Sequence, residues 1–157
     1  MKTIIATIAA ACVLSLAGQS LAEDNSAILK PVNGFMDATG AAADIDRAAS
    51  YWTANQSMLD EFAPYHWTGP NAVRTWWKGL LKDNKANGSS DVTVTASASA
   101  LVQHNDRHAY VVQPAKVSFT TKGQHISLTG ALTFALDRTK TGWKIASCAW
   151  TDLSPTP

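Results

Sequence analysis

Several side chains able to exchange protons lie close together within residues 60–77. Asp60 and Glu61 are adjacent carboxylates, and Tyr65 and His66 follow them in the same short segment. Carboxylate, phenol and imidazole groups commonly serve enzymes as general acids and bases. The segment is also rich in tryptophan, and small-molecule pockets often combine an aromatic wall with a few polar groups. This spacing predicts a pocket with acid–base groups at its mouth, although tryptophans in such a pattern also occur as plain core residues.

A strand, a loop and a helix are expected to hold these side chains. The pattern predicts a short strand over residues 57–62 and a helix over residues 70–85, capped by Thr68 or Gly69. Pro70 suits the first turn of that helix because its missing N–H has no partner there. One apolar stripe recurs at helical spacing along this helix: Val73, Trp76, Trp77, Leu80 and Leu81.

The first 22 residues are typical of a secretory signal peptide. Lys2 precedes an apolar run over residues 3–18, and the small residues Ser20 and Ala22 stand at the positions that determine cleavage. The run is short for a membrane span, and a retained anchor is the alternative interpretation. We expect cleavage after Ala22 and export to the periplasm or the exterior, which leaves residues 23–157 as one domain.

Charge and cysteine content exclude several classes of function. The 135 residues after the signal peptide carry 12 basic and 12 acidic side chains and no basic block, so neither nucleic acid nor a membrane is expected as a partner. Cys148 is the only cysteine in this part, so we expect it buried and unreactive, with an intermolecular disulfide or a reactive thiol as alternatives. His104 and His108 flank a turn but lack further ligands, so no metal is expected. No nucleophile elbow or phosphate loop is present, and no cofactor is expected.

Two helices precede the central segment. Ile28, Val32, Phe35, Met36 and Thr39 follow a helical period that ends near Gly40. Pro31 predicts that this helix begins at about residue 28 or later, because proline is tolerated in a first turn. Asp44 is a good N-cap for a second helix, which we expect to fade by residues 55–56. The apolar face of this second helix consists of Ile45, Ala48, Ala49 and Trp52.

The periodicity changes from helical to alternating after residue 90. Alternation over residues 92–100 predicts a first long strand, and turns at 104–107, 122–124 and 139–142 separate three more strands. These strands are expected over residues 108–121, 125–137 and 143–151. Helices followed by antiparallel hairpins predict an α+β fold, in which three helices pack in a strongly curved mixed or antiparallel sheet.

Three segments of the chain form a recognisable set: the Gly-Pro-x-Ala start of the third helix at residues 69–72, the segment Gly-Trp-Lys-Ile-Ala-Ser-Cys-Ala-Trp at 142–150, and Asp-Glu-Phe-x-Pro-Tyr-x-Trp-x-Gly-Pro at 60–70. With them the chain resembles the nuclear-transport-factor-2-like superfamily, which is also called SnoaL-like or ketosteroid-isomerase-like. The last motif is similar to that of a secreted branch of the superfamily. The resemblance implies a cone in which the sheet wraps the helices around an apolar pocket, and a homodimer formed through the outer sheet face.

The resemblance also implies a role for Asp60. Steroid isomerases carry a proton-shuttling Asp nine residues before the Gly that opens helix three, and Asp60 and Gly69 have this spacing. Only one of Asp60 and Glu61 can face the pocket if both lie on a strand, and the resemblance favours Asp60. Burial in an apolar cone would raise its pKa. Asp60 with Tyr65 and His66 is similar to the acid–base sets of dehydratases with this fold.

The rest of the isomerase machinery does not carry over. The isomerases need a Tyr on helix one and a protonated carboxyl on a late strand, and the matching positions here read Phe35-Met36 and Leu132-Thr133-Phe134. Loss of each such donor costs roughly 3 kcal/mol of transition-state stabilisation.

Three hypotheses remain for the function. The first is an exported module that binds a small, mostly apolar or amphipathic molecule. Its cavity would be lined by Trp52, Trp67, Trp76, Trp77, Tyr110 and Trp150. The second is an isomerase or dehydratase with Asp60 as general base. The third is a dimeric structural or partner-binding module with no occupied pocket.

Overall fold

The fold consists of three helices and a seven-stranded sheet: two helices precede the first strand, and the third lies between the second and third strands. The computed structural model describes residues 14–40 and 43–154, with side chains from residue 25 onward. The helices are α1 (Leu14–Thr39), α2 (Ile45–Ser50) and α3 (Ala72–Asn87). The strands are β1 (Trp52–Leu59), β2 (His66–Gly69), β3 (Ser89–Ala96), β4 (Leu101–His104), β5 (His108–Thr121), β6 (Gln124–Thr139) and β7 (Gly142–Asp152).

Helix α1 packs one apolar face against the interior. Ile28, Val32, Phe35 and Met36 are buried, which confirms the predicted stripe. The predicted start of the helix was wrong, because Pro31 lies inside α1. Proline removes one backbone donor, but the apolar face continues on both sides of it, and this packing outweighs the lost hydrogen bond.

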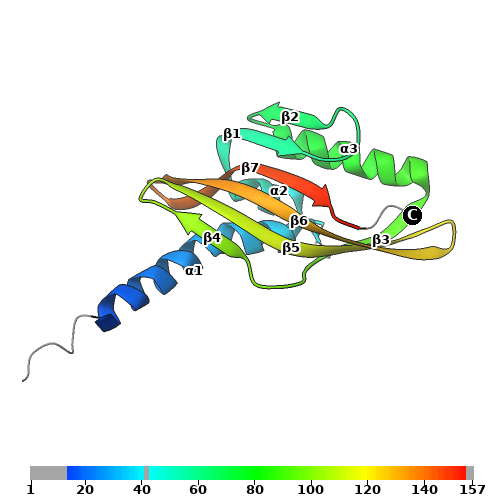
Figure 1. The fold of residues 1–157 in the computed structure, drawn as a ribbon. Helices are drawn as coiled ribbons and strands as arrows, with labels where there is room; N and C mark the ends of the chain where they lie inside the picture. The colour runs from blue at the N-terminus through cyan, green and yellow to red at the C-terminus, as the bar shows by residue number, and fades with distance from the viewer. Residues whose placement is uncertain (1–13, 41–42, 155–157) are drawn as a thin grey trace, which may run out of the picture.

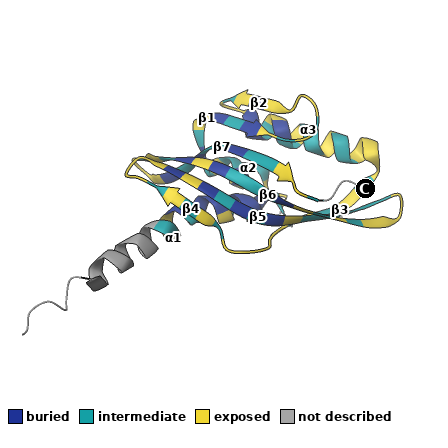
Figure 2. Ribbon diagram, viewed as in Figure 1, coloured by how far each residue is buried: buried dark blue, intermediate teal, exposed yellow. Residues whose placement is uncertain are grey.

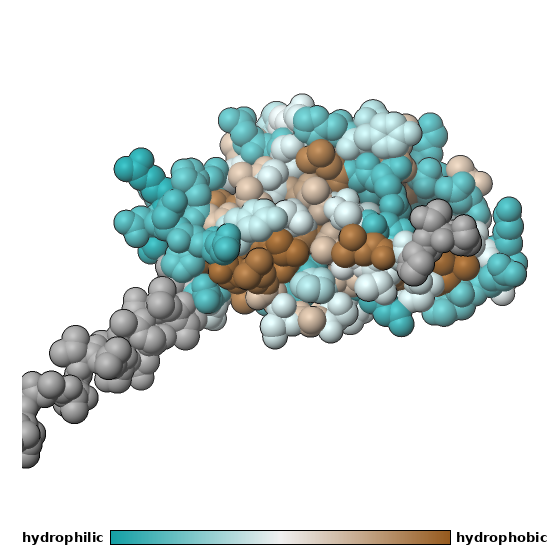
Figure 3. Space-filling view, viewed as in Figure 1, coloured by the Kyte–Doolittle hydropathy of each residue, from teal (hydrophilic) through white to brown (hydrophobic). Residues whose placement is uncertain are grey.

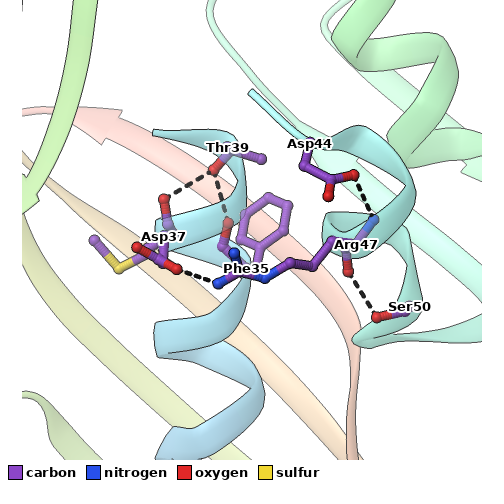
Figure 4. Close-up of polar contacts among 7 residues, drawn as sticks. Phe35, Asp37, Thr39, Asp44, Arg47 and Ser50 are labelled. Atoms are coloured by element: carbon purple, nitrogen blue, oxygen red, sulfur yellow. Dashed lines mark hydrogen bonds and ion pairs between the residues drawn. The ribbon is translucent and has the colours of Figure 1, made fainter. Parts of the chain in front are cut away.

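Helix α2 begins at the predicted cap and ends earlier than predicted. The Asp44 side chain accepts a hydrogen bond of 3.0 Å from the backbone N–H of Arg47, and Arg47 forms an ion pair with Asp37 of α1 (Figure 4). The helix ends at Ser50, and Trp52 is the first residue of β1 rather than part of the helix. Asp44 and Arg47 thus fix α2 against the C-terminal end of α1.

Strand β1 is longer than predicted and begins earlier. Trp52, Gln56 and Met58 are buried along it, and β1 pairs with β2 on one side and with β7 on the other. Trp52 also fits the helical period of α2, so the local pattern favoured a helix here. Pairing with two neighbouring strands decides the strand conformation, and neither neighbour is visible in the local sequence.

The sheet is mixed and does not close on itself. The strand order is β2-β1-β7-β6-β5-β3, with β4 also paired to β5, and β1 and β7 are parallel while the other pairs are antiparallel. Figure 1 shows the long β5–β6 hairpin and β7 curling around the helices. Helix α3 contacts β1 and β2 near one edge and β3 at the other. The α+β cone predicted from the sequence is confirmed.

The first long strand of the sequence prediction begins and ends earlier than predicted, and a short strand that was not predicted follows it. Alternation over residues 92–100 predicted one strand, but β3 ends at Ala96 and β4 begins at Leu101. Both strands pair with β5: β3 pairs with its stretch between Ala115 and Thr121, and β4 pairs with its stretch between Ala109 and Val112. The break lets one continuous partner strand curve while its neighbours change direction.

Helix α3 is capped from a distant strand rather than by its own preceding residues. Its N-cap is Asn71, whose side chain makes no capping hydrogen bond, so the prediction of Thr68 or Gly69 was wrong. The buried Gln56 of β1 instead accepts a hydrogen bond of 3.1 Å from the backbone N–H of Val73. Gly88 ends the helix in the left-handed conformation, φ 67°.

The core lies between the helices and the concave face of the sheet. Figure 2 shows buried residues concentrated in the middle strands and exposed residues toward the turns. Phe134 has no exposed surface and meets Phe35 of α1 edge-to-face, with ring centroids 6.2 Å apart. The core therefore fills one end of the cone and leaves the end beside α3 for the candidate site.

Candidate functional site

A cavity of about 830 Å³ opens between α3, the C-terminal end of α1 and the concave side of the sheet. Its volume is within the range of small-molecule sites. The wall is mainly apolar and aromatic, and the residues of this kind are Phe35, Met58, Phe62, Trp76, Trp77, Leu80, Leu81, Val92, Val94, Val117, Phe119, Leu128, Leu132 and Trp150. The cone therefore has a hollow large enough for an organic molecule.

Asp60 lies in the wall of this cavity, directly after β1. Its Oδ2 accepts a hydrogen bond of 2.7 Å from Nε1 of Trp76, and its Oδ1 accepts one of 2.8 Å from the backbone N–H of Glu61. Burial raises the pKa of Asp60, and the charge of Asp83 acts in the same direction, while the two hydrogen bonds oppose the shift. Asp60 is thus a carboxylate held in one orientation by α3 at an apolar wall.

Glu61 lines the same cavity as Asp60. The prediction that only one of the two can face the pocket was wrong, because β1 ends at Leu59 and strand alternation does not extend to residues 60–61. Burial raises the pKa of Glu61, with further contributions from the charges of Asp60 and Asp152. A hydrogen bond with the Trp150 side chain lowers it. The site therefore contains two neighbouring carboxylates, of which Asp60 accepts a hydrogen bond from a tryptophan.

Tyr65 and His66 lie outside the residues that line the cavity. Tyr65 has φ 69° and a side chain that is 62 % exposed, and its backbone closes the loop after β1 through Asp60 N to Tyr65 O, 3.2 Å. His66 is exposed and its Nε2 lies 3.0 Å from Oγ of Ser57. The loop does not bring Tyr65 and His66 together with Asp60 in the cavity.

The predicted aromatic residues fall into two groups. Trp76, Trp77 and Trp150 line the cavity, and the rings of Trp76 and Trp77 are 5.8 Å apart at 54°. Trp52 and Trp67 are buried and do not line it. They pack instead behind two wall residues: Trp52 edge-to-face on Phe35, with centroids 5.3 Å apart, and Trp67 on Phe62, 4.9 Å apart.

Tyr110 lies on the outer face of the sheet. Its neighbours Ala109 and Val111 are buried, so strand alternation turns Tyr110, 45 % exposed, away from the cavity. Leu101 on the adjacent β4 is also exposed. Figure 3 shows apolar side chains gathered on this face over β4 and β5.

Cys148 is buried, as predicted, and forms no disulfide. Burial raises the pKa of its thiol well above the usual value, and the charge of Asp60 adds to this. The thiol therefore stays protonated and unreactive at neutral pH. Within the described parts of the chain, no three His, Cys, Asp or Glu side chains are grouped closely enough to hold a metal ion.

Sequence reasoning missed several wall residues. On α3 the signal was present, because the missed residues Leu80, Asp83 and Asn87 follow the predicted Trp76 at helical spacing and share its face. On β5 the alternation of Val117, Phe119 and Thr121 was visible, but alternation alone does not tell which face is concave.

The predicted signal peptide falls mainly outside the described residues, since residues 1–13 are not described and side chains begin at residue 25. None of the helices in the described part of the chain combines the length and apolar character needed to cross a membrane.

Solved structures with this fold are numerous and distant in sequence. A hexachlorocyclohexane dehydrochlorinase, LinA-type3 from Novosphingobium barchaimii, matches with a TM-score of 0.74 at 12% identity over 89% of this chain and 93% of its own. An NTF2-like protein with a cystatin-like fold from Novosphingobium aromaticivorans gives 0.69 at 18% over 94% of both chains. A ketosteroid isomerase-like protein from Erwinia carotovora atroseptica gives 0.68 at 18% over 85% and 98%. At these identities the likeness concerns the fold alone, and no curated protein matches the sequence.

The family is shown by a sequence model rather than by these structures. The model of the SnoaL-like domain matches residues 28–149, from Ile28 in α1 into β7. The matched segment contains α2, α3, the loop with Asp60 and Glu61, strands β1 to β6 and most of β7. With this sequence match and the cone geometry together, the chain belongs to the SnoaL-like domain family and has the NTF2-like fold.

Proposed function

We propose that this protein binds a small, mostly apolar molecule in the cavity of the cone. The observation that carries the proposal is a hollow of about 830 Å³ whose wall is mainly apolar and aromatic and also carries charged and polar residues. Trp76 and Trp77 would provide contact area, and Asp60 and Glu61 would orient a polar end of the ligand.

The same wall favours binding over steroid-isomerase chemistry. At the positions where the resemblance places oxyanion donors, Phe35 and Leu132 present hydrocarbon to the cavity. Tyr65 and His66, which would complete a dehydratase-like set with Asp60, lie outside the lining. Proton abstraction next to a carbonyl needs hydrogen-bond donors that stabilise the developing oxyanion. A site with a base but without such donors lacks much of this transition-state stabilisation.

One observation nevertheless supports an enzyme as the second candidate. Asp60 is a fixed carboxylate in an apolar wall, and burial raises its pKa toward the range useful to a general base. Two structural relatives are described as a dehydrochlorinase and a ketosteroid isomerase-like protein. An isomerase or lyase reaction here would begin with proton abstraction by Asp60, and Asp60→Asn would abolish turnover while leaving ligand binding in place.

Native mass spectrometry of the protein purified from its own host tests the binding proposal. We expect a retained small molecule in the wild type and its loss in Leu128→Trp, which fills the cavity from β6. Ser127→Trp is the matched control, because Ser127 is the exposed neighbour on the same strand. A clean mass for the wild type, together with no binding of apolar probes in solution, would contradict the proposal.

Two further expectations accompany this proposal. Intact-mass analysis of the secreted protein should give a chain that starts at Glu23, the residue after the expected cleavage site. The outer sheet face with Leu101 and Tyr110 is the surface expected to pair with a second copy. Analytical ultracentrifugation tests this homodimer: the wild type should sediment as a dimer and Leu101→Lys as a monomer. A monomeric wild type would contradict the proposed homodimer.

A further inference from the structure

The charges at the cavity are strongly unbalanced although the whole chain is almost neutral. Among the described residues that line the cavity, four are acidic and one is basic, whereas the full chain has 12 acidic and 13 basic side chains. The acidic residues are Asp60, Glu61, Asp83 and Asp91, and the basic one is Lys85. The cavity lining therefore carries a net negative charge, although the whole chain has nearly equal numbers of acidic and basic side chains.

The carboxylate of Asp60 is held by an indole N–H and not by a cation. Trp76 donates to Asp60 at 2.7 Å, and the Trp150 side chain lowers the pKa of Glu61. Every charged group that shifts the pKa of either carboxylate is itself negative: Asp83 for Asp60, and Asp60 and Asp152 for Glu61. The two tryptophans therefore favour the charged carboxylates without neutralising them.

Helix ends add to the same negative potential. The C-terminal turn of α1 contributes Thr39 to the cavity, and the C-terminal turn of α3 contributes Asn84 and Asn87. A helix C-terminus carries a partial negative charge equivalent to about half an elementary charge. Two such ends meet at one hollow, so backbone and side chains favour the same sign of ligand.

The wall chemistry matches an organic cation better than a metal ion. Aromatic faces attract ammonium groups, and tryptophan does so most strongly. Trp76, Trp77 and Trp150 line the cavity, with the first two rings set at 54° so that they form a corner. A metal ion needs several oxygen or nitrogen ligands around it, and the described residues provide no cluster of three candidate ligands.

We propose that the ligand of this cavity is an amphipathic organic cation, an amine or quaternary ammonium group on an apolar body. The charged group lies beside Asp60 and Glu61 and against the tryptophan corner, and the apolar body lies along Val117, Phe119 and Leu128. This inference rests on the proposed binding function and specifies its ligand class. Anions of similar shape are repelled by the carboxylates and by both helix ends.

Three probes that share one naphthalene body test the sign of the ligand charge by isothermal titration calorimetry on the mature protein. The cation is (1-naphthylmethyl)trimethylammonium, the neutral probe is 1-naphthalenemethanol, and the anion is 1-naphthylacetate. We expect the cation to bind at least about tenfold more tightly than the neutral probe, since one desolvated ion pair or cation–π contact is worth about this factor. The anion is expected to bind more weakly than the neutral probe.

Variants assign the preference to the carboxylates. Asp60→Asn and Glu61→Gln should each reduce cation affinity about fivefold and leave the affinity for 1-naphthalenemethanol within about twofold. Asp106→Asn is the control, because it removes the same charge from an exposed turn outside the cavity. Circular dichroism checks that each variant is folded.

The outcomes separate this inference from the function on which it rests. Tighter binding of the neutral or anionic probe overturns the cation assignment and leaves a binding cavity in place. An equal loss of cation affinity in Asp106→Asn also overturns it, because the preference would then reflect overall charge. If none of the three probes binds at millimolar concentration, the binding function itself fails and the inference fails with it.

Discussion

Nε1 of Trp76 donates a hydrogen bond of 2.7 Å to Oδ2 of Asp60, and this bond joins the middle of α3 to the loop that follows β1. The bond stabilises the charged form of a carboxylate that burial destabilises. Asp60 therefore keeps a fixed orientation while its pKa remains raised. Most of what we expect of the site depends on this pair.

Removal of the indole donor should raise the pKa of Asp60 further. In Trp76→Phe the ring remains but the N–H is lost, so desolvation acts without its main opposition. Carbon-13 NMR titration of the Asp60 carboxyl measures the change. Trp77→Phe is the control, because it removes the neighbouring indole and leaves the Trp76–Asp60 bond in place. A lower Asp60 pKa in Trp76→Phe would contradict the assigned role of the bond.

The raised pKa of Asp60 should appear in the pH dependence of stability. The folded protein holds the Asp60 proton to higher pH than the unfolded chain, whose value is near 3.8, so this group makes the free energy of unfolding fall as pH rises through the interval between the two values. Asp60→Asn removes that contribution, and its free energy of unfolding should fall less across the interval. Urea unfolding from pH 3.5 to about pH 7 measures both proteins. Parallel curves for the wild type and the variant would show that Asp60 is not destabilised by burial.

Two phenylalanines of the cone should differ in their cost of truncation. Phe134 has no exposed surface, so Phe134→Ala should lower the free energy of unfolding by about 3–5 kcal/mol. Phe119 lies partly exposed at the cavity wall, so Phe119→Ala should cost about 1–2 kcal/mol and mainly enlarge the cavity. Urea denaturation gives both values. Equal losses would indicate that the space beside Phe119 is closed and packed rather than hollow.

Substitutions of Tyr65 and His66 should leave ligand affinity unchanged within about twofold, because neither residue lines the cavity. Tyr65→Phe and His66→Ala can be compared with Trp77→Ala, which removes wall area and should weaken binding. Calorimetry with the naphthyl cation is the measurement. A large loss in Tyr65→Phe would mean that the loop after β1 closes over the ligand.

Gly130 allows Trp150 to cross β6 toward the cavity. A Cβ at this position would lie 2.3 Å from the backbone oxygen of Thr151 and 2.5 Å from the Trp150 ring. Gly130→Ala should therefore cost about 1–3 kcal/mol of unfolding free energy and displace Trp150. Gly130→Ala should lower both the free energy of unfolding and the ligand affinity. Ser127→Ala, on the exposed side of the same strand, should change neither quantity. Unchanged stability in Gly130→Ala would contradict this packing.

The sequence by itself determined several elements and the family, and local chemistry explains why. The stripe of α1, the Asp44 cap and the turns between the long strands depend on neighbours within a few residues, and all of them are found in the structure. The motif at residues 60–70 marked the segment with both cavity carboxylates, although the sequence predicted a strand there and the structure has a loop.

Only the tertiary structure decided what depends on residues far apart in the chain. Gln56 caps α3 from β1, and β7 holds Trp52 in a strand despite its helical spacing. Asp60 and Glu61 both reach the cavity because β1 ends at Leu59, directly before them. Tyr110 points outward because side chains alternate between the two faces of the sheet, and core packing buries the face that carries Ala109 and Val111. These choices follow from long-range pairing and burial, whose energies exceed local propensities and leave no mark on neighbouring residues.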